Sequence, residues 1–265
     1  MRIISTEVRS SQHNHLIEAF LKPLLALSNL QYAALGPFEH HGRNYPLPRF
    51  TFLGPNSADP IRIGLFGAIH GDEPAGAYAL AEFLHQLTTD PISAEGFELQ
   101  IYPICNPTGF ENNTRESATG RDLNREFWKH SAEPEVQILE KELQQGHFSG
   151  LIQLHADDTS EGLYGFVKGH TLTEHLLRPA LREAGRILPR NANATIDGFA
   201  ARDGIIYDVY EGVLAAPARM DPVPFEIVFE TPHAEPMDLQ VQALVVAIRT
   251  ILSEYRRLIS FAANI

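Results

Sequence analysis

The sequence has little cysteine, little positive charge and no long apolar run, and each shortage excludes a class of protein. Cys105 is the only cysteine in 265 residues, so an intrachain disulfide and a cysteine-based structural zinc site are excluded. Acidic residues outnumber basic residues by 33 to 21, which gives a formal net charge of −12. Such a chain lacks the basic surface that general nucleic-acid binding and docking on anionic membranes require.

No apolar run approaches the roughly 20 residues that a transmembrane helix needs. The N-terminal segment MRIISTEVRSSQHNHLIEAF also lacks an apolar stretch long enough for a signal peptide. We therefore expect a cytoplasmic protein that binds neither membranes nor nucleic acids. Hydrophobic residues make up 44% of the chain, a usual fraction for a globular protein with a sizeable core.

Strand and helix patterns alternate along the chain. Apolar strand patterns occur at RFTFLG (49–54), IRIGLFG (61–67), FELQIYPIC (97–105), LIQLH (151–155), YGFVKG (164–169) and FEIVFE (225–230). Helical spacing occurs at 14–28, where Pro23 is expected to kink or split the helix, and at 74–87, 133–146, 171–184 and 238–259. No regular pattern is found between 189 and 224.

This alternation predicts a single α/β domain over residues 1–265, in which residues 1–45 form a helical and loop lead-in. We expect a twisted, mixed, largely parallel sheet with helices on both faces. Three predicted strands end in polar residues, namely His70, His155 and Glu230, and the strand at 97–105 leads into a polar loop. Because ligands bind at the carboxyl ends of parallel strands, these four ends predict a site at one edge of the sheet.

His70, Glu73 and His155 form a plausible set of zinc ligands. Catalytic zinc sites use three histidine or carboxylate ligands and leave a fourth position for water. The spacing of the first two residues equally suits a polar turn at the end of a strand, and His155 could be a buried core histidine with Asp157 as a ligand in its place. The glycines of GAIHGDEPAG (67–76) permit tight turns and positive φ, which a ligand loop between strand and helix would need.

The motifs HGDE, NPTGF and GRDLNREF, followed by a histidine and then a glutamate at late strand ends, occur in one order between residues 67 and 232. In this order they resemble the zinc metallocarboxypeptidase family. The sequence is most similar to the short bacterial members, such as murein-peptide amidases that cut next to diaminopimelate. The succinylglutamate desuccinylase and aspartoacylase branch shares much of the same layout.

The resemblance implies a zinc carboxypeptidase-like fold with one Zn²⁺ per chain. His70 and Glu73 match the HxxE ligands of the family, and His155 matches the third ligand. Asp122 matches a carboxylate that accepts a hydrogen bond from the first ligand histidine, which fixes its tautomer. A bland interpretation of Asp122, as the cap of a turn, stays open.

The resemblance also implies a role for each residue of the reaction. Glu230 matches the general base that activates the attacking water, and Arg115 matches the arginine that polarises the scissile carbonyl. Asn124 and Arg125 match the pair that holds the carboxylate of the substrate, for which the planar fork of arginine is suited. The alternative interpretation is that Arg115 is a solvated loop residue with no such role.

Several positions leave alternatives open. Glu226 shares a strand face with Glu230 by the period of two, but Glu230 lies at the carboxyl end of the strand. Ser117 stands where many family members have asparagine, and Arg121 stands where many have an apolar residue. We expect the Arg121 side chain to point to solvent.

The family also uses a mobile tyrosine before the catalytic glutamate, for which GIIYDVYEGV offers Tyr207 and Tyr210 without deciding between them. His40 and His41 lie outside every matched motif, and we expect them in a surface loop. No motif indicates the oligomeric state or the preferred side chain of the substrate.

We expect a zinc metallopeptidase of the carboxypeptidase type, which hydrolyses an amide bond beside a free carboxylate. The substrate would be a peptide or a small amide. The alternatives are an N-acyl amino acid deacylase with the same site, and a non-catalytic binding protein with a zinc-organised cleft.

Overall fold

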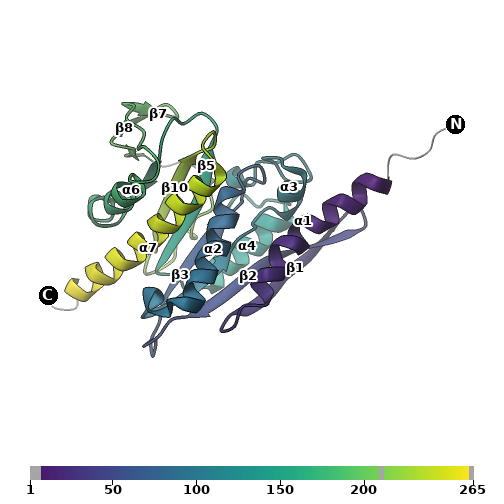
Figure 1. The fold of residues 1–265 in the computed structure, drawn as a ribbon, viewed down its shortest axis with the longest axis horizontal. Helices are drawn as coiled ribbons and strands as arrows, with labels where there is room; N and C mark the ends of the chain where they lie inside the picture. The colour runs from purple at the N-terminus through teal and green to yellow at the C-terminus, as the bar shows by residue number, and fades with distance from the viewer. Residues whose placement is uncertain (1–6, 209–211, 263–265) are drawn as a thin grey trace.

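The computed structural model describes residues 7–208 and 212–262. Within these residues one ten-stranded sheet has the order β1-β2-β4-β3-β5-β10-β6-β9-β8-β7 (Figure 1). The strands are β1 (Gln31–His40), β2 (Arg43–Leu53), β3 (Ile61–Gly67), β4 (Phe97–Tyr102), β5 (Gly150–Asp157), β6 (Tyr164–Val167), β7 (Thr195–Ile196), β8 (Phe199–Arg202), β9 (Ile205–Ile206) and β10 (Phe225–Pro232).

The centre of the sheet is parallel and its edges are largely antiparallel. β4, β3, β5 and β10 are neighbours and run in one direction. β1 and β2 form a long hairpin that joins β4 antiparallel, and β6 joins β10 antiparallel on the other side. The mixed α/β sheet is as predicted, and the parallel part holds the four strands whose ends were expected to meet.

Helices cover both faces of the sheet. They are α1 (Glu7–Leu25), α2 (Ala75–Thr89), α3 (Pro107–Asn112), α4 (Pro134–Gln145), α5 (His170–Leu172), α6 (Arg178–Ala184) and α7 (Met237–Ala262), with 3₁₀ turns η1 (Pro91–Ala94) and η2 (Leu123–Arg125) and the π-helical turn η3 (Thr173–Leu177). α2 packs against α7, and α7 packs against α6 and β10. No helix among the described residues is long and apolar enough to cross a membrane.

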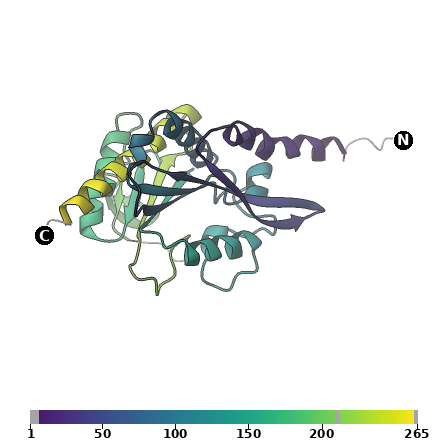
Figure 2. The same cartoon turned by 90° about the horizontal axis from the view of Figure 1, so that it is seen from below.

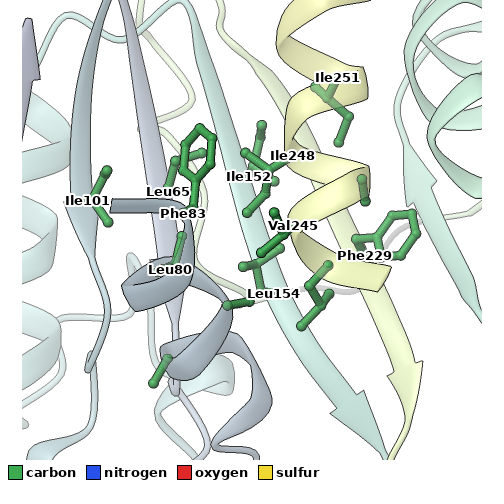
Figure 3. Close-up of a cluster of buried hydrophobic side chains, with 14 of the residues drawn as sticks. Leu65, Leu80, Phe83, Ile101, Ile152, Leu154, Phe229, Val245, Ile248 and Ile251 are labelled. Atoms are coloured by element: carbon green, nitrogen blue, oxygen red, sulfur yellow. The ribbon is translucent and has the colours of Figure 1, made fainter. Parts of the chain in front are cut away.

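The alternation of side chains along the strands builds two apolar layers. Leu65 and Ile152 point to the face covered by α2 and α7, where they pack with Leu80 and Ile248 (Figure 3). Their neighbours in the strands point to the opposite face and pack with α4; this second layer includes Phe66, Tyr102, Val136, Leu139 and Leu151. Each of these buried aliphatic side chains contributes about 1.5–3 kcal/mol by leaving water.

The N-terminal segment differs from the expected helical and loop lead-in, because residues 31–40 form β1. Every residue of β1 is exposed or only partly buried, and its sequence QYAALGPFEH lacks a regular alternation of apolar and polar residues. Pro23 lies inside α1, two residues before the helix ends, and does not split the helix. Together α1 and the β1–β2 hairpin project from one end of the molecule (Figure 2).

Candidate metal centre and catalytic cleft

The carboxyl ends of the central strands meet at one edge of the sheet, as the sequence predicted. His70 follows β3 by three residues, whereas His155 lies in β5 and Glu230 lies in β10. β5 and β10 are parallel, and their register places Glu230 opposite His155. Beyond β4, the N–H of Asn106 donates to the carbonyl of Ala68 at 2.9 Å, which brings the end of β4 to the same edge.

The turn from β3 into α2 positions His70 and Glu73. The N–H of Glu73 donates to the carbonyl of His70 at 3.2 Å. Glycine is needed at Gly71 because a Cβ there would lie 1.9 Å from the carbonyl carbon of Gly109. None of the three glycines in residues 67–76 has a positive φ, and Ala68 has that conformation instead. Close approach of backbones therefore explains these glycines better than the positive φ considered from sequence.

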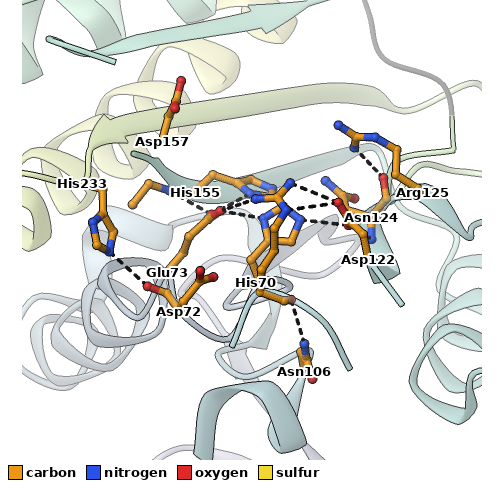
Figure 4. A network of polar contacts seen from close by, with 12 residues as sticks. His70, Asp72, Glu73, Asn106, Asp122, Asn124, Arg125, His155, Asp157 and His233 are labelled. Atoms are coloured by element: carbon orange, nitrogen blue, oxygen red, sulfur yellow. Dashed lines mark hydrogen bonds and ion pairs between the residues drawn. The ribbon is translucent and has the colours of Figure 1, made fainter. Parts of the chain in front are cut away.

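His70, Glu73 and His155 converge, with one ligand atom from each lying within 4.8 Å of the others (Figure 4). Nδ1 of His70 lies 2.7 Å from Oε1 of Glu73, and Nδ1 of His155 lies 3.0 Å from Oε2 of the same carboxylate. All three side chains are buried. Two imidazole nitrogens and a carboxylate are the donors of many catalytic zinc sites, so these residues fit the metal that the resemblance implies.

The surroundings set the protonation states of the three side chains. Burial disfavours ionised Glu73, but hydrogen bonds with His155 and His70 outweigh burial and hold its pKa far below the usual range. Burial lowers the pKa of His155. Burial also opposes protonation of His70, but hydrogen bonds to Asp122 and Glu73 raise its pKa. An ionised carboxylate and a neutral imidazole are the forms that bind metal, because protons compete for the same atoms.

Asp122 connects three parts of the site. Its Oδ1 lies 3.1 Å from Nε2 of His70 and accepts the N–H of Asn124 at 2.9 Å. Its Oδ2 accepts Nε and Nη2 of Arg115 at 3.2 and 3.1 Å. Burial acts to raise the pKa of Asp122, but the hydrogen bond with His70 and the nearby positive charges hold it far below its usual range. This geometry suits the predicted role, since Asp122 can accept a hydrogen bond from Nε2 of His70, the ring nitrogen that faces away from Glu73.

We call His70, Glu73 and His155 the ligand triad. The guanidinium of Arg115 lies between Asp122 and this triad. Its Nη1 donates to Oε1 of Glu73 at 3.1 Å, and its side chain is 40% exposed on the cleft side. A fixed positive charge at this position can stabilise negative charge on a carbonyl oxygen beside the metal. Arg115 is therefore not a solvated loop residue.

Asn124 and Arg125 belong to the turn η2, directly after Asp122. Asn124 is buried, and its Oδ1 accepts the N–H of Leu214 at 2.8 Å. Nη1 of Arg125 donates to the carbonyl of Asn124 at 2.8 Å. Both residues line the same cleft as the ligand triad.

The structure separates Glu230 from its rival Glu226. Glu226 accepts the N–H of Ala216 at 2.6 Å and does not line the cleft. Glu230 lines the cleft, and burial together with the charges of Glu73 and Asp157 raises its pKa well above the usual range. A carboxylate with a raised pKa is a better proton acceptor than a solvated one.

The cleft has a volume of about 360 Å³. Besides the predicted residues, Asp72, Ala156, Asp157, Asp158, Thr159, Tyr164, Phe166, Asp197, Val213, Val228 and His233 line it. Asp157 is engaged elsewhere, because its carboxylate accepts the hydroxyls of Tyr164 at 2.8 Å and Thr159 at 2.7 Å. The geometry favours His155 over Asp157 as the third ligand.

Tyr164 is a cleft residue that the motifs did not indicate. In the antiparallel register of β6 and β10 it lies opposite Glu230. The alternation of YGFV could have indicated it, because Tyr164 and Phe166 share one face of β6, and both line the cleft. The sequence reasoning missed it because the pairing of β6 with β10 is not visible in the sequence.

The remaining sequence candidates lie outside the cleft or outside the described residues. Tyr207 is 60% exposed and lines a separate cavity beside β6 and α5, and Tyr210 falls outside the described residues. The Arg121 side chain is 66% exposed, in agreement with the expectation that it points to solvent. His40 ends β1 and His41 lies in the hairpin turn that follows.

Comparisons with known proteins bear on this geometry. The sequence model of the succinylglutamate desuccinylase/aspartoacylase catalytic domain matches residues 60–192, half of the chain. The chain belongs to this family. The matched residues contain every predicted ligand and both cleft arginines, whereas Glu230 lies beyond them. A comparison with curated proteins gave no match.

Solved structures share the fold of this family member. A candidate metallopeptidase from Shewanella denitrificans OS217 has a TM-score of 0.77 and 22% identity, and the alignment covers 90% of both chains. A metallo-carboxypeptidase from Burkholderia cenocepacia has a TM-score of 0.67 and 17% identity, with 96% of this chain and 70% of that chain covered. A metallo-carboxypeptidase from Pseudomonas aeruginosa has a TM-score of 0.64 and 19% identity, with 91% and 68% covered. The zinc carboxypeptidase-like fold expected from the sequence is confirmed.

Proposed function

We propose that the protein is a zinc-dependent hydrolase that cleaves an amide bond next to a free carboxylate. The observation that carries the proposal is the composition of one cleft, where the ligand triad, the partly buried Glu230 and the cations Arg115 and Arg125 face a common space. The family assignment and the metallopeptidase relatives support the same class of reaction.

Each side chain has a defined task in such a reaction. His70, Glu73 and His155 would hold zinc, which supplies a nucleophile from water near pH 7 and polarises the carbonyl. Glu230 would accept the proton of the attacking water at its carboxylate and then donate it to the leaving amine. Proton transfer by a positioned carboxylate contributes a factor of about 10² to 10⁴.

The two arginines divide the recognition of the substrate. Arg115 would donate to the carbonyl oxygen as it gains negative charge, a role for which its contacts with Asp122 and Glu73 fix the guanidinium in advance. Arg125, with Asn124, would hold the free carboxylate. One arginine would thus stabilise the transition state, and the other would select the substrate.

A carboxypeptidase acting on peptides is the form of this function that we favour. The fold relatives named as metallo-carboxypeptidases align with more than nine-tenths of this chain. The Pseudomonas aeruginosa protein is in complex with (2-guanidinoethylmercapto)succinic acid, whose name denotes a carboxylate-bearing ligand. A cleft with Arg125 beside the metal ligands suits a ligand of that kind.

The second candidate is an N-acyl amino acid deacylase. The observation in its favour is the family assignment, since the names of both enzymes in the matching model denote removal of an acyl group. The chemistry at zinc and Glu230 would be the same, and only the group on the far side of the scissile amide differs. The identity of the substrate therefore distinguishes the two candidates.

Mass spectrometry of products from one pooled substrate set would test the proposal. The pool contains peptides with varied C-termini, murein peptides with diaminopimelate, and N-acyl amino acids, and the control is the variant Glu230→Gln. Loss of one C-terminal residue, absent in the control, would establish the carboxypeptidase. Cleavage of acyl amino acids alone would establish the deacylase. A zinc-loaded protein that converts nothing would contradict the proposal and favour a binding protein.

A further inference from the structure

The loop of residues 113–122, called the Arg115 loop below, carries two residues of the cleft on its two arms. Arg115 lies on the first arm, and Asp122 ends the second arm. A turn joins the arms, in which the N–H of Ser117 donates to the carbonyl of Arg121 at 2.9 Å and the N–H of Gly120 donates to that of Ser117 at 3.0 Å. The position of this turn therefore affects the backbone positions of both Arg115 and Asp122.

Glu133 lies against this turn and binds it with both carboxylate oxygens. Oε2 accepts the hydroxyl of Ser117 at 2.7 Å, and Oε1 accepts the hydroxyl of Thr119 at 2.5 Å. Glu133 is buried and forms the N-terminal cap position of α4, so its backbone is fixed by the helix. Hydrogen bonds to a carboxylate are roughly twice as strong as those between neutral groups.

The rest of the Arg115 loop is held from α3. Nδ2 of Asn106 donates to the carbonyl of Arg115 at 3.3 Å, and the hydroxyl of Thr108 accepts the N–H of Ala118 at 3.1 Å. These bonds fix the backbone of the first arm. Thr108 thereby also holds Ala118 of the turn, whereas Glu133 holds the side chains of Ser117 and Thr119, and the N–H of Ser117 links the turn to Arg121 on the second arm.

We propose that Glu133 is a positioning residue for the metal centre and for Arg115. Its carboxylate anchors the turn of the Arg115 loop, and the two arms transmit this position to Asp122 and Arg115. Ser117, which departs from the family pattern, supplies one of the two hydroxyls that reach Glu133. The effect on Arg115 rests on the proposed function, whereas the effect on Asp122 and His70 rests on metal binding alone.

Zinc affinity, measured by competition with a chromogenic chelator, tests the inference without any substrate. We expect Glu133→Ala to lower zinc affinity about tenfold, the lower end of the effect of removing a partner of a metal ligand. Asp122→Ala should lower it at least as much, and the double variant should be no weaker than Asp122→Ala alone, because the first residue acts through the second. Full additivity, or unchanged affinity in a folded Glu133→Ala protein, would overturn the proposal.

Activity on whichever substrate the pool identifies allows a second comparison of single and double variants. We expect Glu133→Ala to lower kcat about 10- to 100-fold, since a misplacement of about 1 Å can cost that much, with KM nearly unchanged. In the Arg115→Ala background the same substitution should have little further effect. If the wild-type protein converts no substrate, the proposed function fails. The zinc affinities of the single and double variants would still decide the role of Glu133.

Two further variants protect the test against a folding defect. Thr119→Ala and Ser117→Ala remove the donors from the side of the loop, and Thr119 is exposed, so its truncation leaves the core intact. If Glu133→Ala fails to fold, wild-type zinc affinity in both hydroxyl variants would overturn the proposal. Glu116→Gln is the matched control, because it removes an exposed carboxylate from the same loop and should change neither zinc affinity nor kcat.

Discussion

Asp122 lies 3.1 Å from the imidazole Nε2 of His70, although 52 residues separate them in the chain. Asp122 is the cap of η2, which begins directly after it, and the same carboxylate contacts the histidine that follows β3. One residue thereby contacts a predicted metal ligand, binds Arg115 and caps the turn that carries Asn124. The interpretation as a turn cap is confirmed, and the functional one stays a prediction that the same carboxylate can serve at the same time.

Substitution of Asp122 should therefore weaken metal binding first. We expect Asp122→Ala to lower zinc affinity about 10- to 100-fold, because His70 loses the acceptor that fixes its tautomer and orientation. Chelator competition at pH 7 measures this directly. Asp122→Asn keeps the cap and the shape of the side chain but removes the charge, and should retain part of the affinity. Wild-type affinity in Asp122→Ala would show that the contact is structural only.

Replacement of Glu230 should separate metal binding from turnover. We expect Glu230→Gln to keep zinc and lose about 10² to 10⁴ in kcat, because the amide cannot accept a proton from water. Metal content and kcat are measured on the same preparation. Glu226→Gln is the matched control, since this glutamate lies on the same strand but binds the backbone of Ala216. Equal losses in both variants would point to damage of β10 rather than to catalysis.

Truncation of Arg125 should affect recognition of the substrate carboxylate. We expect Arg125→Ala to raise KM for substrates with a free carboxylate by about 10- to 100-fold, since a charge-assisted hydrogen bond contributes about 1.5–3 kcal/mol. The comparison uses the same substrates with the carboxylate converted to an amide. If the amidated substrates lose as much affinity as the acids, Arg125 does not recognise the carboxylate. Arg121→Ala, which truncates an exposed arginine nearby, is the control.

The sequence predicted most of what depends on local pattern. The strong apolar run of β3 was placed with its observed bounds, and the four parallel strands were expected to end at one edge. His70, Glu73 and His155 come together in the structure because each follows or ends one of these strands. The convergence of these three side chains was predictable because the residue types and the strand ends agreed.

What escaped prediction depends on pairing between distant segments. β1 has no buried face, and its sequence lacks the alternation of apolar and polar residues that identifies a strand. Tyr164 enters the cleft through the register of β6 against β10, and Glu133 reaches the Arg115 loop from a different helix. Neither relationship has a spacing signature, because the residues involved are fixed by packing and not by their position in a motif.

Glu135 should make the stability of the protein depend on pH. This residue is 1% exposed in the first turn of α4, and its Oε2 has no hydrogen-bond partner among the described residues. Burial, together with the charge of Glu133, raises the pKa of Glu135 to about 7. The folded state therefore keeps a proton that the unfolded state releases at the usual value for glutamate, about 4.3.

The sign of the effect follows from proton binding. Between about pH 4.3 and pH 7 the folded state binds more protons than the unfolded state, so stability decreases as pH rises and levels off above the folded pKa. Glu135→Gln has no proton to lose. We expect the variant to match the wild type near pH 4.5 and to exceed its free energy of unfolding by about 3 kcal/mol at pH 8. Urea unfolding at intervals between these pH values, with the exposed Glu82→Gln as control, measures the difference. A difference that stays constant with pH would show that Glu135 is already ionised in the folded protein.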